Sequence, residues 1–323
     1  MKRIGILTSG GDAPGMNAAI RSAVRTVISA GGEAFGIDRG YEGLLAEEIE
    51  PLSWQSVGGI VTRGGTILKT ARCPAFMERD VQRRAAEILG KHGIDGLLVI
   101  GGDGSMKGAA ALESFGAMTA VVPGTIDNDM RGTEETIGYD TAVNTVLDAM
   151  RRIRDTAASH DRAAVVEVMG RHSGRIALAA GLAGGAEFTV VPEISFSVDK
   201  IAGGLLAMQK EGRTNSLIVC AEGAMDGRAL AEALKERTHM DICATILGYI
   251  QRGGAPSARD AFLGAILGAA AAHQLLGGAH GFLAGMKGSQ VHIASYEEAA
   301  KEPKSFDESP YRLAMRIGAG REI

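Results

Sequence analysis

Two carboxylates stand two residues apart in the stretch PGTIDND, residues 123–129, which follows the short apolar run TAVV. Asp127 and Asp129 are therefore expected in a turn at the end of a buried strand. Asp, Asn, Gly and Pro are the usual residues of turns, so a polar turn with no further role also explains this stretch. The functional interpretation depends on which other residues reach the same place.

Two glycine-rich stretches, TSGGDAPG at 8–15 and IGGDGS at 100–105, each join an apolar run to a stretch of helical period. Backbone N–H groups in such turns and at helix N-termini bind anions such as phosphate. Neither stretch has the GxGxxG or GxxxxGK[ST] pattern, and one such stretch alone is more simply explained as a tight strand-to-helix turn. Two of them beside acidic residues favour a site for a nucleotide phosphate and Mg²⁺.

The charged residues near these turns have the types that phosphoryl transfer requires. Mg²⁺ is bound through one or two carboxylates plus phosphate oxygens, and Asp103 and Asp129 are the candidates. Asp127 is suited to accept the proton of an attacking hydroxyl group. Arg72 in ILKTARCP and Arg171 in VMGRHSG could stabilise charge on the transferred phosphoryl group, although each arginine alone is also explained as a solvated surface cation.

The elements that must position these residues repeat along the chain as an apolar run, a glycine-rich turn and a helical stretch. Runs without polar alternation are typical of parallel strands that are buried on both faces. Strands that alternate with helices predict βαβ units and a doubly wound α/β sheet. Right-handed crossovers place every strand-to-helix turn at one edge of its sheet, where ligands bind. The runs are RIGILTSGG, DGLLVIGGDGS, AVVPGTIDND, AAVVEVMG, FTVVPE and SLIVCAEGA.

Composition excludes several other classes of protein. The 323 residues suffice for two ordinary α/β domains or one large one, and 46% hydrophobic residues indicate a globular chain. A net charge of −4 gives no support to nucleic-acid binding. Cys73, Cys220 and Cys243 form no CxxC pair, so neither a disulfide framework nor a zinc site is predicted. The longest apolar run, 261–272, is expected to form a buried Ala/Gly-rich helix, and we expect a cytoplasmic protein without membrane association.

In their order and spacing, TSGGDAPGMN, RGGTILKTAR, IGGDGS, PGTIDND, VMGRHSG and QRGG resemble the phosphofructokinase family, most closely its bacterial ATP-dependent members. The similarity runs without essential gaps to about residue 285, and the tail matches more loosely. The resemblance implies two Rossmann-like doubly wound α/β domains with the active site in the cleft between them. It implies a larger ATP-binding domain of residues 1–138 and 251–301, and a smaller sugar-phosphate-binding domain of residues 139–250 and 302–323.

The resemblance also implies an activity, the in-line transfer of the γ-phosphoryl group of ATP to O1 of fructose 6-phosphate in glycolysis. The first Asp of TIDND is the base in this family, which implies that Asp127 deprotonates the sugar hydroxyl. Asp103 would be the Mg²⁺ ligand, and Asp129 would help to organise the Mg²⁺ region. The implied catalytic residues are Asp127, Thr125, Arg171, Gly11 and Arg72.

The same resemblance implies which residues hold the ligands. Positions that match the ATP site are Gly11, Arg72, Cys73, Gly102, Asp103, Gly104, Ser105 and Gly108. Positions that match the sugar-phosphate site are Thr125, Ile126, Asp127, Arg162, Met169, Gly170, Arg171, Glu222, Tyr249 and Arg252. The family's counterpart of Arg162 comes from a neighbouring subunit, which implies a homotetramer.

The phosphoryl donor is predicted from two glycines. Pyrophosphate-dependent relatives have Asp after GGD and Lys before TIDND, where side chains would occupy the space of the nucleotide's α-phosphate. This chain has Gly104 and Gly124 at those positions, so the resemblance points to ATP.

The stretch DICATILGYIQRGG departs from the family pattern at two positions. Bacterial members typically have Arg in place of Cys243, as a cross-subunit ligand of the sugar 6-phosphate, and His in place of Tyr249. A neutral thiol cannot replace the charge-assisted bonds of a guanidinium. One hypothesis is weaker binding of fructose 6-phosphate or a shifted phosphosugar preference, and the alternative is compensation by nearby residues. A further hypothesis is that the chain is a weakly active regulatory paralogue in a hetero-oligomer.

A second predicted site binds an effector, a nucleotide or phosphoenolpyruvate, between subunits in this family. The matching positions are Arg21, Arg25, Arg154, Gly185, Glu187 and Arg213. Arg21 and Arg25 alone are also explained as a solvated helix face, because their i, i+4 spacing puts both on one side. One position that is usually basic is Glu211, so we expect an effector site that is retained but weakened or retuned.

Overall fold

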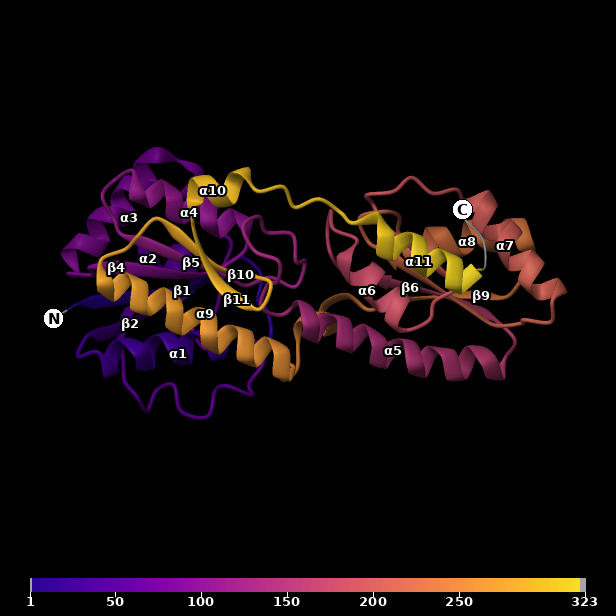
Figure 1. Cartoon of the computed structure of the whole chain (residues 1–323), viewed down its shortest axis with the longest axis horizontal. Coiled ribbons are helices and arrows are strands. Elements are labelled where there is room, and N and C mark those ends of the chain that lie inside the picture. The colour runs from indigo at the N-terminus through magenta and orange to yellow at the C-terminus, as the bar shows by residue number, and fades with distance from the viewer. Residues whose placement is uncertain (1, 320–323) are drawn as a thin grey trace. The chain divides into compact units, whose positions relative to one another are not determined.

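The computed structural model describes residues 2–319, and its contacts divide the chain into two units (Figure 1). Unit 1 takes in the chain up to Thr141 together with Arg252–Lys304. Unit 2 takes in Ala142–Gln251 and the chain from Ser305 onward. Each unit is thus built from two separate stretches of chain, and the boundaries fall within three residues of those that the resemblance implies.

Unit 1 contains a seven-stranded sheet in the order β11-β10-β5-β4-β1-β2-β3. The five inner strands are parallel to one another, and the unbroken apolar runs predict this for β1, β4 and β5. Sequence analysis does not predict the antiparallel edge strands β3 and β11, because their exposed faces need no apolar run. The strands are β1 (Arg3–Ser9), β2 (Glu33–Ile37), β3 (Ile49–Leu52), β4 (Gly96–Gly101), β5 (Thr119–Pro123), β10 (Phe282–Lys287) and β11 (Gln290–Ser295).

Helices cover both faces of this sheet. Figure 1 shows α1 and α9 on one side and α3 and α4 on the other. The core on the α3–α4 side contains the inward-facing residues of β4 together with apolar residues of these two helices. The helices of unit 1 are α1 (Met16–Ser29), α2 (Gly40–Leu45), the 3₁₀ turn η1 (Pro74–Met77), α3 (Arg79–Lys91), α4 (Asp103–Glu113), α9 (Ala258–Gly277) and α10 (Tyr296–Lys301).

Helix α9 contains the apolar run 261–272, and the prediction of a buried Ala/Gly-rich helix is confirmed. Within the described residues α9 is also the one helix long and apolar enough to cross a membrane by length and composition. It packs closely on α1 through glycine: a Cβ on Gly264 would lie 2.6 Å from the carbonyl oxygen of Gly15. A Cβ on Gly268 would overlap with the carbonyl oxygen of Ala19. The small residues of α9 therefore serve helix packing within unit 1.

Unit 2 contains a four-stranded sheet in the order β7-β8-β6-β9, and all of its strand pairs are parallel. Its strands are β6 (Ala163–Val168), β7 (Phe188–Val190), β8 (Ser216–Ala221) and β9 (Ile242–Ile246). Its helical elements are α5 (Tyr139–Ser159), which begins in unit 1, then α6 (Arg175–Ala183), α7 (Val198–Lys210), α8 (Gly227–Thr238), the 3₁₀ turn η2 (Gly248–Arg252) and α11 (Glu308–Ala319).

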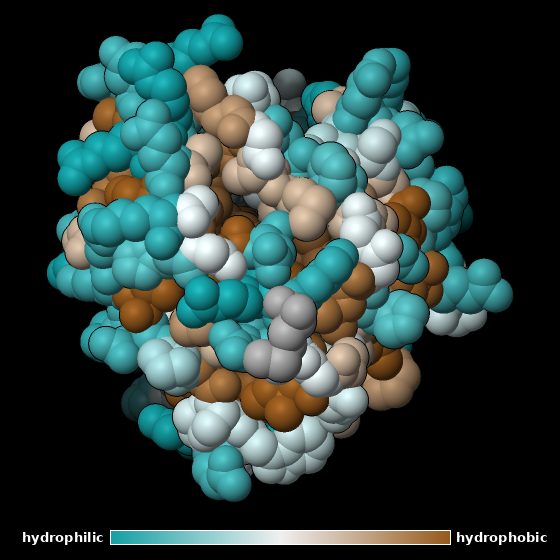
Figure 2. Space-filling view, turned by 90° about the vertical axis from the view of Figure 1, so that its left-hand side faces the viewer, coloured by the Kyte–Doolittle hydropathy of each residue, from teal (hydrophilic) through white to brown (hydrophobic). Residues whose placement is uncertain are grey.

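The distribution of polar and apolar residues on the surface is that expected of helices that bury one face against a sheet. Figure 2 shows polar side chains over much of one face, with apolar residues visible in the hollows between them. Both units are α/β and doubly wound, as predicted, and each has its own hydrophobic core.

Candidate active site

Three loops follow the carboxyl ends of neighbouring strands in unit 1. Gly10–Asp12 follows β1, Gly102–Ser105 follows β4, and Thr125–Asp129 follows β5, and these strands are adjacent in the sheet. The hydroxyl of Ser105 donates to the carbonyl oxygen of Ser9 at 3.1 Å, which ties the first loop to the second. A Cβ on Gly102 would lie 3.8 Å from Cβ of Thr125, so the second loop lies beside the third. The sheet therefore gathers the acidic and glycine-rich turns that the sequence singles out.

The Thr125–Asp129 loop is held by backbone and side-chain hydrogen bonds. The amide of Thr125 donates to the carbonyl oxygen of Ile137 at 3.1 Å, and the hydroxyl of Thr136 donates to the carbonyl oxygen of Thr125 at 2.6 Å. The amide of Asp127 donates to Oγ1 of Thr125 at 3.2 Å. Asp127 is only 4% exposed, whereas Asp129 is exposed. A carboxylate with restricted access to water is therefore fixed two residues from one that faces solvent.

Ile126 and Asn128 lie in the same loop as the two carboxylates. The side chain of Ile126 is buried in the core of unit 1, so only its backbone is available to a ligand. Asn128 has a φ of +47°, a left-handed conformation that Asn tolerates better than most residues, and it lies between the two carboxylates.

Helix α4 directs its N-terminus toward this loop, with Gly102 as the N-cap and Asp103 as its first residue. A helix N-terminus offers unpaired N–H groups and a partial positive charge to an anion. The carboxylate of Asp103 lies 2.7 Å from Nζ of Lys107, one turn further along the helix. The predicted ATP-site stretch therefore has the geometry of a phosphate-binding turn.

The glycines of this region differ in what a side chain at each position would meet. A Cβ on Gly104 would meet no atom within 4 Å, so this position borders open space, as the donor prediction requires. A Cβ on Gly124 would lie 3.0 Å from Cε of Met16, so Gly124 faces packed protein and the expected open room beside it is not found. A Cβ on Gly108 would lie 2.8 Å from the ring of Tyr41, so this glycine makes room for an aromatic side chain.

Tyr41 is a residue of this site that the sequence analysis missed. Its buried hydroxyl donates to the carbonyl oxygen of Ser105 at 2.7 Å, and its ring stacks on Phe76 with 4.1 Å between centroids. Burial raises the pKa of Tyr41 well above its usual value, so the hydroxyl remains a donor at neutral pH. Tyr41 thereby joins the start of α4 to η1, which follows Cys73 directly.

The segment that carries Arg72 and Cys73 is attached to the β1 loop. The hydroxyl of Thr70 donates to the carbonyl oxygen of Gly10 at 2.8 Å. The buried amide of Asn17 accepts a hydrogen bond from the Ile67 amide and donates to the carbonyl oxygens of residues 63 and 64. Arg72 is exposed and Cys73 is half-buried against the unit 1 core. Sequence reasoning missed Asn17 as well, although it stands inside the quoted motif TSGGDAPGMN.

Arg252 lies at the β1 loop although 240 residues separate it from Asp12. Its Nη1 is 3.4 Å from the carbonyl oxygen of Asp12 and 3.9 Å from the Asp12 carboxylate. A Cβ on Gly11 would overlap with the same guanidinium, so a side chain at position 11 would require Arg252 to move. The structure thus brings together a predicted sugar-phosphate residue and a predicted ATP-site residue in unit 1.

Unit 2 gathers a second set of predicted residues at the carboxyl ends of β6 and β8. One carboxylate oxygen of Glu222 accepts from the amides of Gly170 and Arg171, at 3.2 and 2.9 Å. The amide of Met169 donates to the side chain of Gln251 at 3.2 Å. Gln251 is fully buried, and sequence reasoning missed its role although it begins the QRGG motif.

Tyr249 belongs to the same 3₁₀ turn, η2, as Gln251, and it is 81% exposed. The amide group of Gln251 donates to the carbonyl oxygen of Gly248 at 3.0 Å, so the turn that presents Tyr249 is fixed to the Met169 loop. The phenol of Tyr249 is therefore accessible to a ligand beside the Met169–Arg171 segment.

Arg162 is not brought to this set within one chain. It precedes β6, whereas Met169 follows it, so about 20 Å of strand separates their backbones. Arg162 instead forms an ion pair with Asp241 at 3.2 Å. Cys243 pairs with Ala164 in the register of β6 and β9, so Cys243 and Arg162 lie at the same amino-terminal end of this sheet.

The predicted effector residues form two sets. In unit 2, the buried carboxylate of Glu187 lies 3.6 Å from Arg154 and 3.2 Å from Arg213, and Arg154 donates to the carbonyl oxygen of Gly185 at 2.6 Å. Glu211 ends α7 on the surface.

In unit 1, Arg21 and Arg25 share one face of α1, and the guanidinium of Arg25 lies 4.4 Å from the ring centroid of Trp54. Partial desolvation and the positive charge of Arg21 lower the pKa of Arg25. The two arginines therefore form a local concentration of positive charge with an aromatic ring beside it.

The donor set fits Mg²⁺ only together with phosphate oxygens. Among residues 2–319, no group of three His, Cys, Asp or Glu side chains could hold a metal ion by itself. Asp129 offers an exposed carboxylate and Asp103 a partly exposed one, on adjacent loops. One or two carboxylates with phosphate oxygens and water is the usual Mg²⁺ environment in nucleotide sites.

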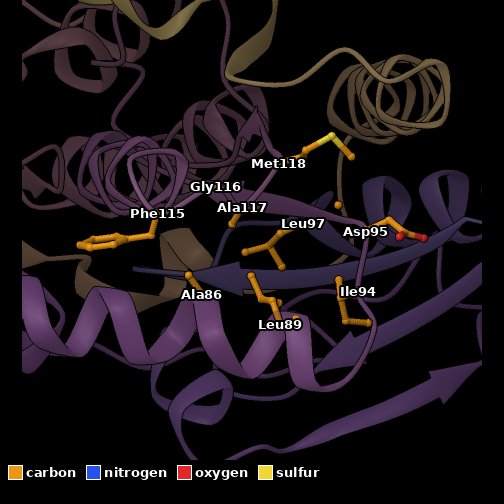
Figure 3. A pocket seen from close by; sticks show the side chains of 11 residues that line it. Ala86, Leu89, Ile94, Asp95, Leu97, Phe115, Gly116, Ala117 and Met118 are labelled. Atoms are coloured by element: carbon orange, nitrogen blue, oxygen red, sulfur yellow. The ribbon is translucent and has the colours of Figure 1, made fainter.

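A pocket of about 250 Å³ lies elsewhere in unit 1 (Figure 3). Leu89 of α3, Ile94 and Leu97 near the start of β4, and Phe115 and Met118 before β5 line it. It is therefore at the amino-terminal ends of strands whose carboxyl ends carry the candidate active site, and the site chemistry does not involve it.

Comparisons with known proteins agree with this geometry. The family model described as phosphofructokinase matches residues 3–275. The ATP-dependent 6-phosphofructokinase of Clostridioides difficile (strain 630) is 48% identical, over 97% of this chain and 98% of its own. That of Thermoanaerobacter sp. (strain X514) is 50% identical, over 97% of this chain and 98% of its own.

Solved structures share the fold. Phosphofructokinase from Saccharomyces cerevisiae superposes with a TM-score of 0.87 at 35% identity, covering 98% of this chain but only 47% of the yeast chain. A pyrophosphate-dependent phosphofructokinase from Marinobacter aquaeolei gives a TM-score of 0.87 at 22% identity, covering 100% of this chain and 93% of that chain. The second likeness concerns the fold alone.

Proposed function

The chain belongs to the phosphofructokinase family, and we propose that it transfers the γ-phosphoryl group of ATP to O1 of fructose 6-phosphate. The observation that carries this proposal is the buried Asp127 on a hydrogen-bonded loop beside the N-terminus of α4. That arrangement provides a proton acceptor next to a phosphate-binding turn. The products are fructose 1,6-bisphosphate and ADP, and the protein is a transferase of glycolysis.

Asp127 accepts the proton of the O1 hydroxyl as the O1–Pγ bond forms and the bond from Pγ to the β,γ-bridging oxygen breaks. Low water access around Asp127 keeps the proton transfer directed at the sugar. The N–H groups at the start of α4 hold phosphate oxygens, and Arg72 and Arg171 are proposed to stabilise charge on the transferred group. Mg²⁺, held by Asp103 and Asp129 with phosphate oxygens, would neutralise charge on the phosphates.

Further ligand contacts are proposed for the residues that carry the resemblance. Gly11, Cys73, Gly102, Gly104, Ser105 and Gly108 line or shape the nucleotide site, and Met169, Gly170, Glu222, Tyr249 and Arg252 contact the sugar phosphate. ATP as donor is supported by the open space at Gly104 and by the names of the relatives with 48% and 50% identity.

We infer a homotetramer in the cytoplasm whose sugar-phosphate site is completed by a neighbouring copy. The position of Arg162 supports this, since it lies at the opposite end of β6 from Met169 in its own chain. A nucleotide or phosphoenolpyruvate effector is proposed for the residues around Glu187 and for Arg21 and Arg25.

A second candidate is a kinase for another phosphosugar, or a weakly active regulatory subunit. Cys243 favours it, because a thiol near Arg162 cannot supply the charge-assisted phosphate bonds of an arginine.

The deciding experiment is a steady-state assay with Mg·ATP and increasing fructose 6-phosphate. We expect saturable turnover, and a loss of about 100- to 10,000-fold in kcat for Asp127→Asn with little change in half-saturation. Asp148→Asn, on the exposed surface of α5, is the control and retains wild-type rates. Turnover with a different phosphosugar alone would show that fructose 6-phosphate is not the substrate. An Asp127→Asn variant with wild-type activity would show that Asp127 is not the base.

A further inference from the structure

Asp260 is a buried carboxylate that the proposed reaction does not use. It lies in the first turn of α9 and is 1% exposed. Its Oδ1 accepts from the amide of Gly138 at 2.8 Å, and its Oδ2 accepts from the amide of Thr141 at 2.7 Å and from the Thr141 hydroxyl. A buried carboxylate costs stability unless hydrogen bonds compensate, and this one receives three.

The segment that Asp260 holds is the one that pairs with the loop of the base. Ile137, next to Gly138, donates its amide to the carbonyl oxygen of Pro123 at 2.9 Å and accepts from the amide of Thr125 at 3.1 Å. The hydroxyl of Thr136 donates to the carbonyl oxygen of Thr125 at 2.6 Å. Ile137 therefore forms an isolated parallel β-bridge with Gly124, and residues 136–138, called the 136–138 segment below, lie beside residues 123–125.

Residues 136–138 are also packed closely: the side chains of Thr136 and Ile137 are almost fully buried. Gly138 has a φ of +104°, a conformation that favours glycine, and a Cβ there would lie 2.6 Å from Cβ of Ala13. The backbone of Asp260 is close as well, since a Cβ on Gly15 would lie 3.0 Å from its carbonyl oxygen. The first turn of α9 is thus packed between the β1 loop and the 136–138 segment.

We propose that Asp260 is a positioning residue for the reaction: by holding Gly138 it fixes the 136–138 segment, whose hydrogen bonds to Thr125 in turn fix Asp127. This inference rests on the proposed function, in which Asp127 is the base. Asp260 itself touches no reacting atom. Displacement of a base by about 1 Å can cost on the order of 100-fold in rate, so loss of this support acts mainly on kcat.

The test compares Asp260→Asn with Glu113→Gln. Glu113 is a matched control because its carboxylate also accepts from a backbone amide and a hydroxyl, both of Thr119, but at the amino-terminal start of β5. Asp260→Asn is expected to lower kcat about 10- to 100-fold and to change both half-saturation constants less than about threefold. Glu113→Gln is expected to lower the melting temperature to a similar extent and to leave kcat within about threefold.

Hydrogen exchange measured by mass spectrometry supplies a readout that does not depend on activity. Asp260→Asn should accelerate exchange in peptides that span residues 123–130, and Glu113→Gln should not. If the wild type turns over no fructose 6-phosphate, the proposed function fails while this comparison still decides the role of Asp260. Unchanged exchange in folded Asp260→Asn, or an equal kcat loss in Glu113→Gln at equal melting temperature, would overturn the proposal.

A second variant covers the case in which Asp260→Asn does not fold. Thr136→Val removes only the hydroxyl that donates to Thr125, and it is expected to lower kcat about 3- to 10-fold with faster exchange in residues 123–130. In a folded double variant the two kcat losses should combine to less than their product, because both act through Thr125. Wild-type kcat and exchange in Thr136→Val would contradict the proposed route.

Discussion

Arg252 occupies the space that a side chain at position 11 would need, so Gly11 and Arg252 form a matched pair across 241 positions of sequence. Gly11 shows no left-handed backbone conformation, so the effect of a side chain at position 11 would come from displacement of the guanidinium and not from backbone strain. The relationship joins a glycine-rich turn to the QRGG motif within unit 1.

Gly11→Ala is therefore expected to displace Arg252 and to raise the half-saturating fructose 6-phosphate concentration about 10-fold or more, since a hydrogen bond to a charged group contributes about 1.5–3 kcal/mol. Gly90→Ala, on α3 with no neighbour near its Cβ, is the control. In the Arg252→Ala background, the additional Gly11→Ala substitution should cause no further rise in the half-saturating fructose 6-phosphate concentration. A further loss there would show that Gly11 acts independently.

Cys243→Arg is expected to lower the half-saturating fructose 6-phosphate concentration about 10- to 100-fold, because a guanidinium makes charge-assisted bonds to phosphate that a thiol does not. Arg162, which lies at the same end of the unit 2 sheet, provides the neighbouring positive charge. Saturation curves for wild type, Cys243→Arg and Cys243→Ala make the comparison. An unchanged apparent affinity in Cys243→Arg means that other residues already compensate.

Trp54 is the one tryptophan of the chain and lies against Arg25, so its fluorescence reports on the proposed effector residues. Titration with ADP or phosphoenolpyruvate is expected to change the emission, and Arg25→Ala should abolish the change. Glu211→Arg removes a negative charge and adds a positive one, so it should lower the concentration needed for half of the effect. Equal responses in Glu211→Arg and wild type would leave Glu211 without a role in effector binding.

Packing of α9 on α1 predicts opposite effects for two glycines of one helix. Gly268→Ala forces the helices apart at the Ala19 carbonyl and should lower the free energy of unfolding by about 1–3 kcal/mol. Gly277→Ala meets no neighbour within 4 Å and should be neutral or stabilising by up to about 1 kcal/mol. Denaturant unfolding of both variants measures the difference, and a stabilised Gly268→Ala would mean that the helices can separate without cost.

The three cysteines are expected to differ in alkylation. Burial raises the pKa of Cys220 to about 12, so at pH 8 roughly one thiol in ten thousand is ionised, and the side chain is also inaccessible. Iodoacetamide should modify Cys73 and Cys243, which are half-buried, and leave Cys220 unmodified in the native protein. Mg·ATP should slow modification of Cys73 only, as mass spectrometry of the labelled peptides can check. Equal protection of Cys243 would argue against the assignment of Cys73 to the nucleotide site.

Local patterns in the sequence determined the strands β1 and β4 to β8, the turns that follow them and the residue types of the site. Unbroken Val/Ile/Leu runs predict buried parallel strands, and Gly, Asp and Asn after them predict the turns, because backbone conformation and burial depend mainly on nearby residues. The carboxylates Asp103, Asp127 and Asp129 were predictable in this way. The strands β2, β3, β9, β10 and β11 were not predicted, and of these the exposed antiparallel edge strands β3 and β11 carry no apolar run.

Only the tertiary structure decided which distant residues meet. Strand order brings the loops after β1, β4 and β5 together. Long-range packing places the guanidinium of Arg252 against Gly11 and the carboxylate of Asp260 within hydrogen-bond distance of the Gly138 amide. It also turns Gly124 toward Met16. These relationships depend on contacts between segments that are far apart in the chain, and no local periodicity records them.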